Sequence, residues 1–213
     1  GQPGGTWDLD FRQVMGNQGS ALDAWEGGER TVIPEAELVD DGRCYLDLHV
    51  SDNGDGTYRY EYALYNLDMN RSVSSITIPV SEDVAVTSLG FKAVQSADDG
   101  FNNDPWEAAR DGSAVTWSTS PVAEHPNSNP LGWGNLYNFW FDADAAPAEG
   151  SVTLGVYRTD LEGPSSFAGA IRVPGGGGAP PPPVGTIFRR GDTDGNGTVE
   201  LTDAVFILGY LFQ

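Results

Sequence analysis

Short runs in which apolar and polar residues alternate recur through residues 1–173, and this pattern constrains the fold more than any other feature of the chain. In the run 57–64, three tyrosines alternate with Arg59 and Glu61. A period of two places the tyrosines on one face of a strand and the charged residues on the other. The run 44–50 alternates in the same way, and a turn-forming Asp-Asn-Gly-Asp-Gly segment joins the two. We therefore predict a β-hairpin here.

Gly, Pro and Asp residues separate further runs of this kind, which we also predict to be strands. The predicted strands cover residues 30–39, 44–50, 57–64, 72–80, 84–94, 114–117, 136–143, 151–158 and 168–173. Many short strands are typical of an antiparallel β-sandwich, either jelly-roll or immunoglobulin-like, and the chain is predicted to be all-β. One helix is predicted before residue 174, because residues 104–110 begin with an N-cap aspartate, a proline and a capping-box glutamate.

Composition divides the chain into three parts. Residues 1–173 form the predicted sandwich domain, and residues 174–184 form a linker that contains four glycines followed by Ala-Pro-Pro-Pro-Pro-Val. The glycine run is flexible, whereas the proline run favours a stiff polyproline II spacer. Residues 185–213 form a short tail that carries the most specific motif of the sequence.

The tail motif is a run of oxygen-bearing residues that begins at Asp192. Counted from Asp192, oxygen side chains fall at positions 1, 3, 5, 9 and 12 of a twelve-residue loop, and Gly197 at position 6 permits a sharp turn. Thr198, at position 7, offers its backbone carbonyl. Calcium requires six to eight oxygen ligands, and this spacing wraps the chain around one ion. The predicted Ca²⁺ ligands are Asp192, Asp194, Asn196, Thr198, Glu200 and Asp203.

These residues resemble a dockerin repeat. The pattern Gly-Asp-x-Asp-Gly-Asn-Gly-x-Val-x-x-x-Asp, followed by a short apolar helix, is typical of the EF-hand-type loop-helix unit of that family. The resemblance implies calcium binding, secretion and a cohesin-like partner. A weaker resemblance covers the N-terminal part, where Tyr-Ala-Leu-Tyr-Asn at 62–66 and Trp-Gly-Asn-Leu-Tyr-Asn-Phe at 133–139 look like secreted bacterial β-sandwich proteins of unassigned function.

The predicted helix at 204–212 is apolar on nearly every side, so something must cover it. Leaving one of its large side chains in water costs on the order of 1.5–3 kcal/mol. The cover is the chain's own sandwich, another copy of the chain or a different protein. Docking onto another copy in a head-to-tail fashion builds a ring or an open filament.

Charge excludes several partners. The chain has 31 acidic and 11 basic residues, which gives a net charge of −20. A field of this sign repels nucleic acids and anionic lipid surfaces. The sequence also has no apolar stretch long enough to span a bilayer, so neither nucleic-acid binding nor membrane insertion is expected. Together with the calcium motif and the near absence of lysine, the acidic charge favours an extracellular location.

The remaining candidate sites each have a structural alternative. The turn 52–57 mimics the start of a calcium loop but lacks an acid at the twelfth position, and the acidic cluster 98–104 is either a second calcium site or a solvated turn with a helix cap. His49 and His125 are predicted to be surface residues, and Cys44 a buried thiol. Trp117 and Trp140 lie in strand runs and are predicted to be in the core, whereas Trp133 lies in a glycine-rich loop and is the best candidate for exposure.

The sequence supports two functions more than any catalytic one. The first is a secreted, non-enzymatic structural protein whose calcium-bound tail docks subunit onto subunit. The second is a carbohydrate-binding or surface-attachment module, with the tail as an adaptor to a cohesin-like protein and a polysaccharide as the other ligand. An enzyme is the least supported, because no spacing selects a catalytic pair among the acids.

Overall fold

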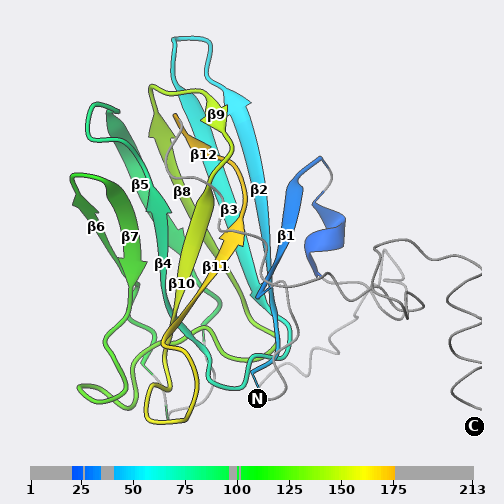
Figure 1. Ribbon diagram of the computed structural model, residues 1–213, viewed down its shortest axis with the longest axis vertical. Coiled ribbons are helices and arrows are strands. Elements are labelled where there is room, and N and C mark those ends of the chain that lie inside the picture. Colours follow the sequence, from blue (N-terminus) through cyan, green and yellow to red (C-terminus); the bar gives the residue numbers. More distant parts are fainter. Residues whose placement is uncertain (1–20, 26, 35–40, 96–99, 101, 176–213) are drawn as a thin grey trace, which may run out of the picture.

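Period-two alternation does produce strands in the computed structural model, which describes residues 21–25, 27–34, 41–95, 100 and 102–175 (Figure 1). The described part is nearly all β, and its only helical element is the four-residue 3₁₀ turn η1 (Ala21–Ala24). The twelve strands are β1 (Glu29–Ile33), β2 (Cys44–Asp52), β3 (Tyr58–Asn66), β4 (Val73–Pro79), β5 (Val86–Lys92), β6 (Glu107–Asp111), β7 (Ala114–Ser118), β8 (Leu136–Ala143), β9 (Pro147–Ala148), β10 (Ser151–Val156), β11 (Ser166–Ala170) and β12 (Val173–Pro174).

The strands form two five-stranded sheets in which every pair is antiparallel. Sheet A has the order β1-β2-β3-β8-β5, and sheet B has the order β11-β10-β4-β7-β6. A small third sheet pairs β12 with β9. The predicted hairpin at 44–64 is confirmed as β2–β3, in which Cys44 lies opposite Asn66 and Asp52 opposite Tyr58.

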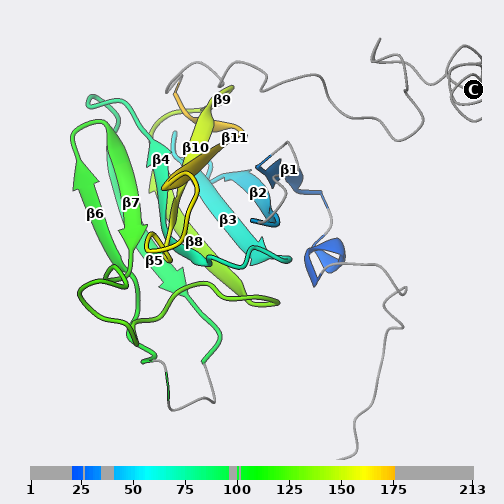
Figure 2. The same cartoon turned by 60° about the horizontal axis from the view of Figure 1, so that its bottom comes forward.

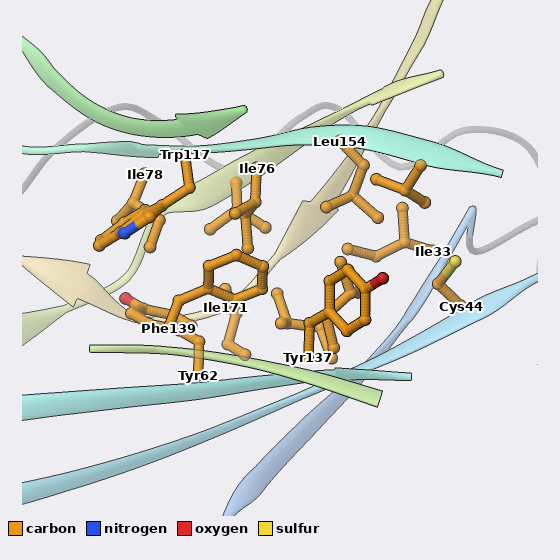
Figure 3. Packing of buried hydrophobic residues seen from close by; sticks show 14 of the residues in the cluster. Ile33, Cys44, Tyr62, Ile76, Ile78, Trp117, Tyr137, Phe139, Leu154 and Ile171 are labelled. Carbon is orange, nitrogen blue, oxygen red and sulfur yellow. The ribbon is translucent and has the colours of Figure 1, made fainter. Parts of the chain in front are cut away.

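The apolar residues of both sheets meet between them, in a sandwich-like arrangement. Figure 3 shows Trp117 and Ile76 of sheet B pointing toward Phe139 and Tyr137 of sheet A, and the ring centroids of Trp117 and Phe139 are 5.6 Å apart. The predicted burial of Cys44 is confirmed, because its thiol is fully enclosed and desolvation raises its pKa well above the ordinary value.

The two lateral sides of the sheets are closed differently. Figure 2 shows β1 on one side of the unit and β6 with β7 on the other. At the β1 side, Gly169 of β11 has no side chain, and this lets Ile33 of β1 pack against its backbone. At the β6 side, Trp106 fills the gap, because its indole stacks on Phe91 of β5 at 5.8 Å and donates a hydrogen bond to the Asn129 carbonyl.

The predicted helix at 104–110 is wrong. Residues 107–111 form β6, which pairs with β7 across a tight turn in which Gly112 has a positive φ of 46°. The local capping signals are outweighed, because a strand at this position forms backbone hydrogen bonds with β7 and lets Trp106 be buried in the core. The first predicted strand is also shorter than expected in the described part, since β1 ends at Ile33, before Pro34, and residues 35–40 lie outside that part.

Most of the linker and the whole tail lie outside the described residues, which end at Gly175. Within the described ranges, no helix is long and apolar enough to cross a membrane.

Candidate functional site

All six predicted calcium ligands, Asp192 to Asp203, belong to the part of the chain that the structure does not describe. The calcium loop therefore stays a prediction from sequence. The described residues contain no group of three or more His, Cys, Asp or Glu side chains placed to hold a metal.

The calcium-like segment 52–57 serves as the β2–β3 turn. The Asp52 carboxylate accepts a hydrogen bond from the Gly54 N–H at 2.7 Å, and the Asp55 carboxylate accepts from the Thr57 N–H at 3.0 Å and the Thr57 hydroxyl at 2.6 Å. These bonds hold the pKa of Asp55 below its ordinary value, the hydroxyl of Thr57 contributing most. Both carboxylates are therefore engaged by their own turn, as the hairpin prediction requires.

The acidic cluster 98–104 is described only in part, because Asp98, Asp99 and Phe101 are outside the described ranges. The Asn102 side chain accepts a hydrogen bond from the Asp104 N–H, which is turn chemistry. Asp104 and Glu107 line a polar hollow of about 310 Å³ together with Ser118 and Thr119.

The two histidines lie on different elements. His49 lies on β2, where its ring is 5.9 Å from the ring of Trp25. His125 lies in the loop between β7 and β8, and its carbonyl accepts hydrogen bonds from Ser128 and Tyr157. Their contacts are structural ones, in line with the surface positions predicted for both.

The outer surface of sheet A carries the richest side-chain chemistry of the described residues. Outward positions on its central strands alternate with the core positions, so they lie in rows across the sheet. We call this surface the aromatic face, and its defining residues are Tyr45, His49, Arg59, Glu61, Tyr65, Asn138, Trp140 and Asp142. Tyr45 and Tyr65 are directly opposite in register, with ring centroids 6.4 Å apart.

Trp140 is half-buried on the aromatic face, and the prediction that it belongs to the core is wrong. In β8 it alternates with the core residues Phe139 and Phe141 and faces outward. Its indole lies across Gly90 of the edge strand β5, where a Cβ atom would overlap the ring. The indole therefore rests against the backbone of β5, at a point where the β5–β8 register shifts.

The charged groups of the aromatic face are paired with one another. Arg59 donates to Asp142 at 3.3 Å, and its guanidinium carbon lies 5.7 Å from the centroid of the Trp140 ring. At the β1 edge of the same surface, Arg30 binds Asp47 through two hydrogen bonds of 2.7 and 2.9 Å. A hydrogen bond from Ser88, assisted by Arg59, lowers the pKa of Asp142. The face thus carries little net charge in a chain of net charge −20.

Trp133 is 63% exposed, which confirms the sequence prediction. Its loop is held at both ends: the Gly134 N–H donates to the Asn66 carbonyl at 2.8 Å, and the Asn66 side chain donates to the Leu131 carbonyl at 2.9 Å. Asn66 is itself fully buried. The indole is therefore held on a preorganised loop, which lowers the entropic cost of binding a ligand there.

A buried ion pair fixes other loops at the end of the sheets where the β3–β4 loop lies. Arg71 makes two hydrogen bonds to Asp41, at 2.5 and 2.7 Å, and a third to the Pro164 carbonyl at 2.8 Å. Asp41 precedes β2, Arg71 precedes β4 and Pro164 precedes β11, so one guanidinium joins three segments far apart in sequence. Tyr157 and Arg158 line a second hollow nearby, of about 300 Å³, with Asn70 and Ser72.

A scan against protein-family models and a search of the curated proteins both find no match for this chain. Function is therefore inferred from its own residues. The aromatic face is not among the sites predicted from sequence, although the sequence carries a signal for it. In 136–143 the polar residues Asn138 and Asp142 alternate with aromatic ones, and Trp140 occupies a polar-face position between them.

Proposed function

We propose that this chain is a secreted, non-enzymatic structural protein whose calcium-bound tail docks one subunit onto another. The observation that carries the proposal is the acidic sequence Asp192–Asp203, followed directly by an apolar segment that is predicted to form a helix and would need a cover. Calcium would neutralise the loop and preorganise the helix before docking, which reduces the ordering entropy that association costs. Head-to-tail docking would then build a ring or a filament at a cell surface or in the extracellular medium.

The strand order supports an immunoglobulin-like sandwich over a jelly roll as the scaffold. In sheet A, the order β2-β3-β8-β5 corresponds to strands A, B, E and D of that fold, and in sheet B the order β4-β10-β11 corresponds to C, F and G. The β6–β7 hairpin then extends the C edge of sheet B, and β1 extends the A edge of sheet A. Such scaffolds place their loops at two ends and leave the faces available for contacts.

Light scattering on the full chain tests the docking mechanism. We expect particles of high mass in calcium and smaller particles after a chelator is added. The double variant Asp192→Asn/Asp194→Asn should behave in calcium as the wild type does in chelator. The matched control, Asp83→Asn/Glu124→Gln, removes the same two negative charges from exposed positions outside the tail and should still assemble. Assembly that survives the loop variant would refute the mechanism.

A specific observation favours carbohydrate binding as the second candidate. Trp133 is the most exposed large apolar side chain among the described residues, and its loop is fixed by hydrogen bonds. Exposed indoles stack on the apolar faces of sugar rings, and the tail would then serve as the adaptor to a cohesin-like protein. Retention on insoluble polysaccharide that is lost in Trp133→Ala, with unfolding unchanged, would favour this function over subunit docking.

A further inference from the structure

The hollow of about 300 Å³ near the buried Arg71–Asp41 pair lies where the β3–β4 loop, the end of β10 and the β7–β8 loop meet (Figure 1). We call it the Ser72 hollow, and its lining residues are Asn70, Ser72, Val122, Pro126, Pro130, Tyr157 and Arg158. Small-molecule sites usually measure about 300–1,000 Å³. The Ser72 hollow is therefore the size of a site for one small ring.

Two polar side chains of the hollow have no partner among the residues that the structure describes. The backbone of the β3–β4 loop is bonded: the Asn70 N–H donates to the Asp41 carbonyl at 3.2 Å, and the Ser72 carbonyl accepts from the Tyr157 N–H at 3.0 Å. The Asn70 amide and the Ser72 hydroxyl make no hydrogen bond to any described side chain or backbone group. Each of these two groups can both donate and accept, so together they offer a ligand a mixed set of hydrogen bonds.

Ser72 also has a backbone conformation that residues with a side chain seldom adopt, with a φ of 56°. Its surroundings hold it there, because its N–H donates to the Met69 carbonyl and the next residue, Val73, exchanges two backbone bonds with Leu131. Glycine would occupy this conformation without strain. Strained residues of this kind cluster at binding sites. The presence of a serine in place of a glycine therefore indicates that the hydroxyl is used.

The opposite wall of the hollow is apolar and held in place. It consists of Val122, Pro126 and Pro130, which belong to the β7–β8 loop. The Tyr157 hydroxyl donates to the His125 carbonyl at 3.0 Å and accepts from the Ser128 hydroxyl at 3.2 Å, so this loop is bonded to the end of β10. The two walls thus have a fixed spacing before a ligand arrives, which lowers the entropic cost of binding.

The charge of the hollow favours a neutral ligand. Arg158 is its only charged lining residue, and the Arg158 guanidinium already makes two hydrogen bonds of 3.0 Å to the Asp160 carboxylate. A phosphorylated ligand is disfavoured further by the net charge of −20. A sugar ring fits both walls, because its hydroxyl groups donate and accept hydrogen bonds and its C–H groups form an apolar surface.

We propose that the Ser72 hollow binds one neutral sugar residue, with hydrogen bonds to Asn70 and Ser72 and apolar contacts to Val122 and the two prolines. The inference rests on carbohydrate binding, the second function proposed above, and assigns it a site separate from Trp133, which does not line the hollow. It depends on neither calcium nor the tail, because every lining residue precedes the linker.

NMR titration of the ¹⁵N-labelled full chain with the methyl glycosides of glucose, galactose, mannose and xylose tests the site. We expect a saturable shift of the Ser72 and Tyr157 amide signals with at least one of these glycosides. Ser72→Gly removes the hydroxyl and relieves the strained φ, so the variant should fold at least as well as the wild type. Its affinity should be about two- to twelve-fold lower, which is the effect of one neutral hydrogen bond. Asn70→Ala combined with Ser72→Gly should abolish saturable binding.

Two variants serve as controls. Ser88→Gly makes the same change at the other described serine with a positive φ, 55°, which lies on β5 and outside the hollow. Its affinity for the glycoside should equal that of the wild type, and so should that of Trp133→Ala. No shift with any glycoside, or an unchanged affinity in Ser72→Gly, would overturn the proposal. If the chain is nevertheless retained on polysaccharide through Trp133, carbohydrate binding stands without this site; if it is not retained, both proposals fail.

Discussion

The outer surfaces of the two sheets differ sharply, although both arise from the same alternation of residues. Sheet A presents the aromatic face, with large rings and paired charges. Sheet B presents small side chains on four of its five strands, β11, β10, β4 and β7, and only its edge strand β6 adds larger charged ones, Glu107 and Asp111. The small outward residues are Ser75, Thr77, Pro79, Ala114, Thr116, Ser118, Ser151, Thr153, Gly155, Ser166, Ala168 and Ala170. The inward residues of both sheets are apolar because they fill the shared core. The outward residues of the two sheets share no such packing requirement, so their chemistry can differ with the use of each surface.

The difference also concerns how side chains depend on one another. On sheet A, Arg30 binds Asp47, and in a second group Arg59 contacts both Asp142 and the Trp140 ring. On sheet B, the only side-chain bond between outward residues that the structure gives joins the hydroxyls of Thr77 and Thr116, at 3.0 Å. Substitutions on sheet A should therefore be costly and coupled, whereas those on sheet B should be mild and additive.

The largest expected effect is at the Arg30–Asp47 pair. Asp47 is 3% exposed and accepts two hydrogen bonds from the Arg30 guanidinium. Asp47→Ala removes both bonds and should lower the free energy of unfolding by about 1.5–3 kcal/mol. The matched change on sheet B, Thr77→Ala, should cost about 0.2–1 kcal/mol. Urea unfolding measures both. Equal losses at the two sites would remove the contrast between the faces.

The next effect is at Gly90. Gly90→Ala places a methyl group into the Trp140 indole and should destabilise by about 1–3 kcal/mol, because a ring packed against a backbone has little room to move. Gly155→Ala on sheet B meets only the Ser75 hydroxyl, which can rotate away, and should cost less than about 1 kcal/mol.

A double-mutant cycle sharpens the Gly90 prediction. In a Trp140→Ala background the indole is gone, so Gly90→Ala should become nearly neutral, and the coupling between the two substitutions should be about 1 kcal/mol or more. Additive losses would show that Gly90 is needed for the register shift of β5 alone and not for the ring.

The smallest effect is a pH dependence that arises at Asp142 of sheet A. The pKa of Asp142 is lower in the folded protein than its unfolded value of about 3.9, so ionised Asp142 contributes stability above that pH. The contribution is lost as the pH falls through the lowered pKa. Asp142→Asn should therefore destabilise at pH 7, and its effect should shrink as the pH falls through the lowered pKa of Asp142, as measured by urea unfolding. Thr116→Ala on sheet B should give the same change at both pH values.

Local patterns predicted the parts of the fold that depend on local information. The β2–β3 hairpin follows from alternation around Asp-Asn-Gly-Asp-Gly, and β8 and β10 follow from their own periodicity. The capping pattern predicts a helix at 104–110 because it is a local signal. The contacts that make a strand there are not local: they are the ladder with β7 and the bond from Trp106 to the Asn129 carbonyl. Hydrophobicity alone predicts a core position for Trp140, because it cannot reveal that Gly90 on the neighbouring strand leaves room for the ring on the outer surface.

The placement of β8 between β3 and β5 has a consequence for synthesis on the ribosome. The β2–β3 hairpin emerges early, but the hydrogen-bonding groups along one edge of β3 stay unpaired until β8 has been made. Pairing over such sequence separations is slow, and an open strand edge recruits strands of other growing chains. The excess of acidic residues makes nascent copies repel one another during this interval. The negative charge that repels nucleic acids and anionic lipid surfaces thus also opposes aggregation while the chain is being completed.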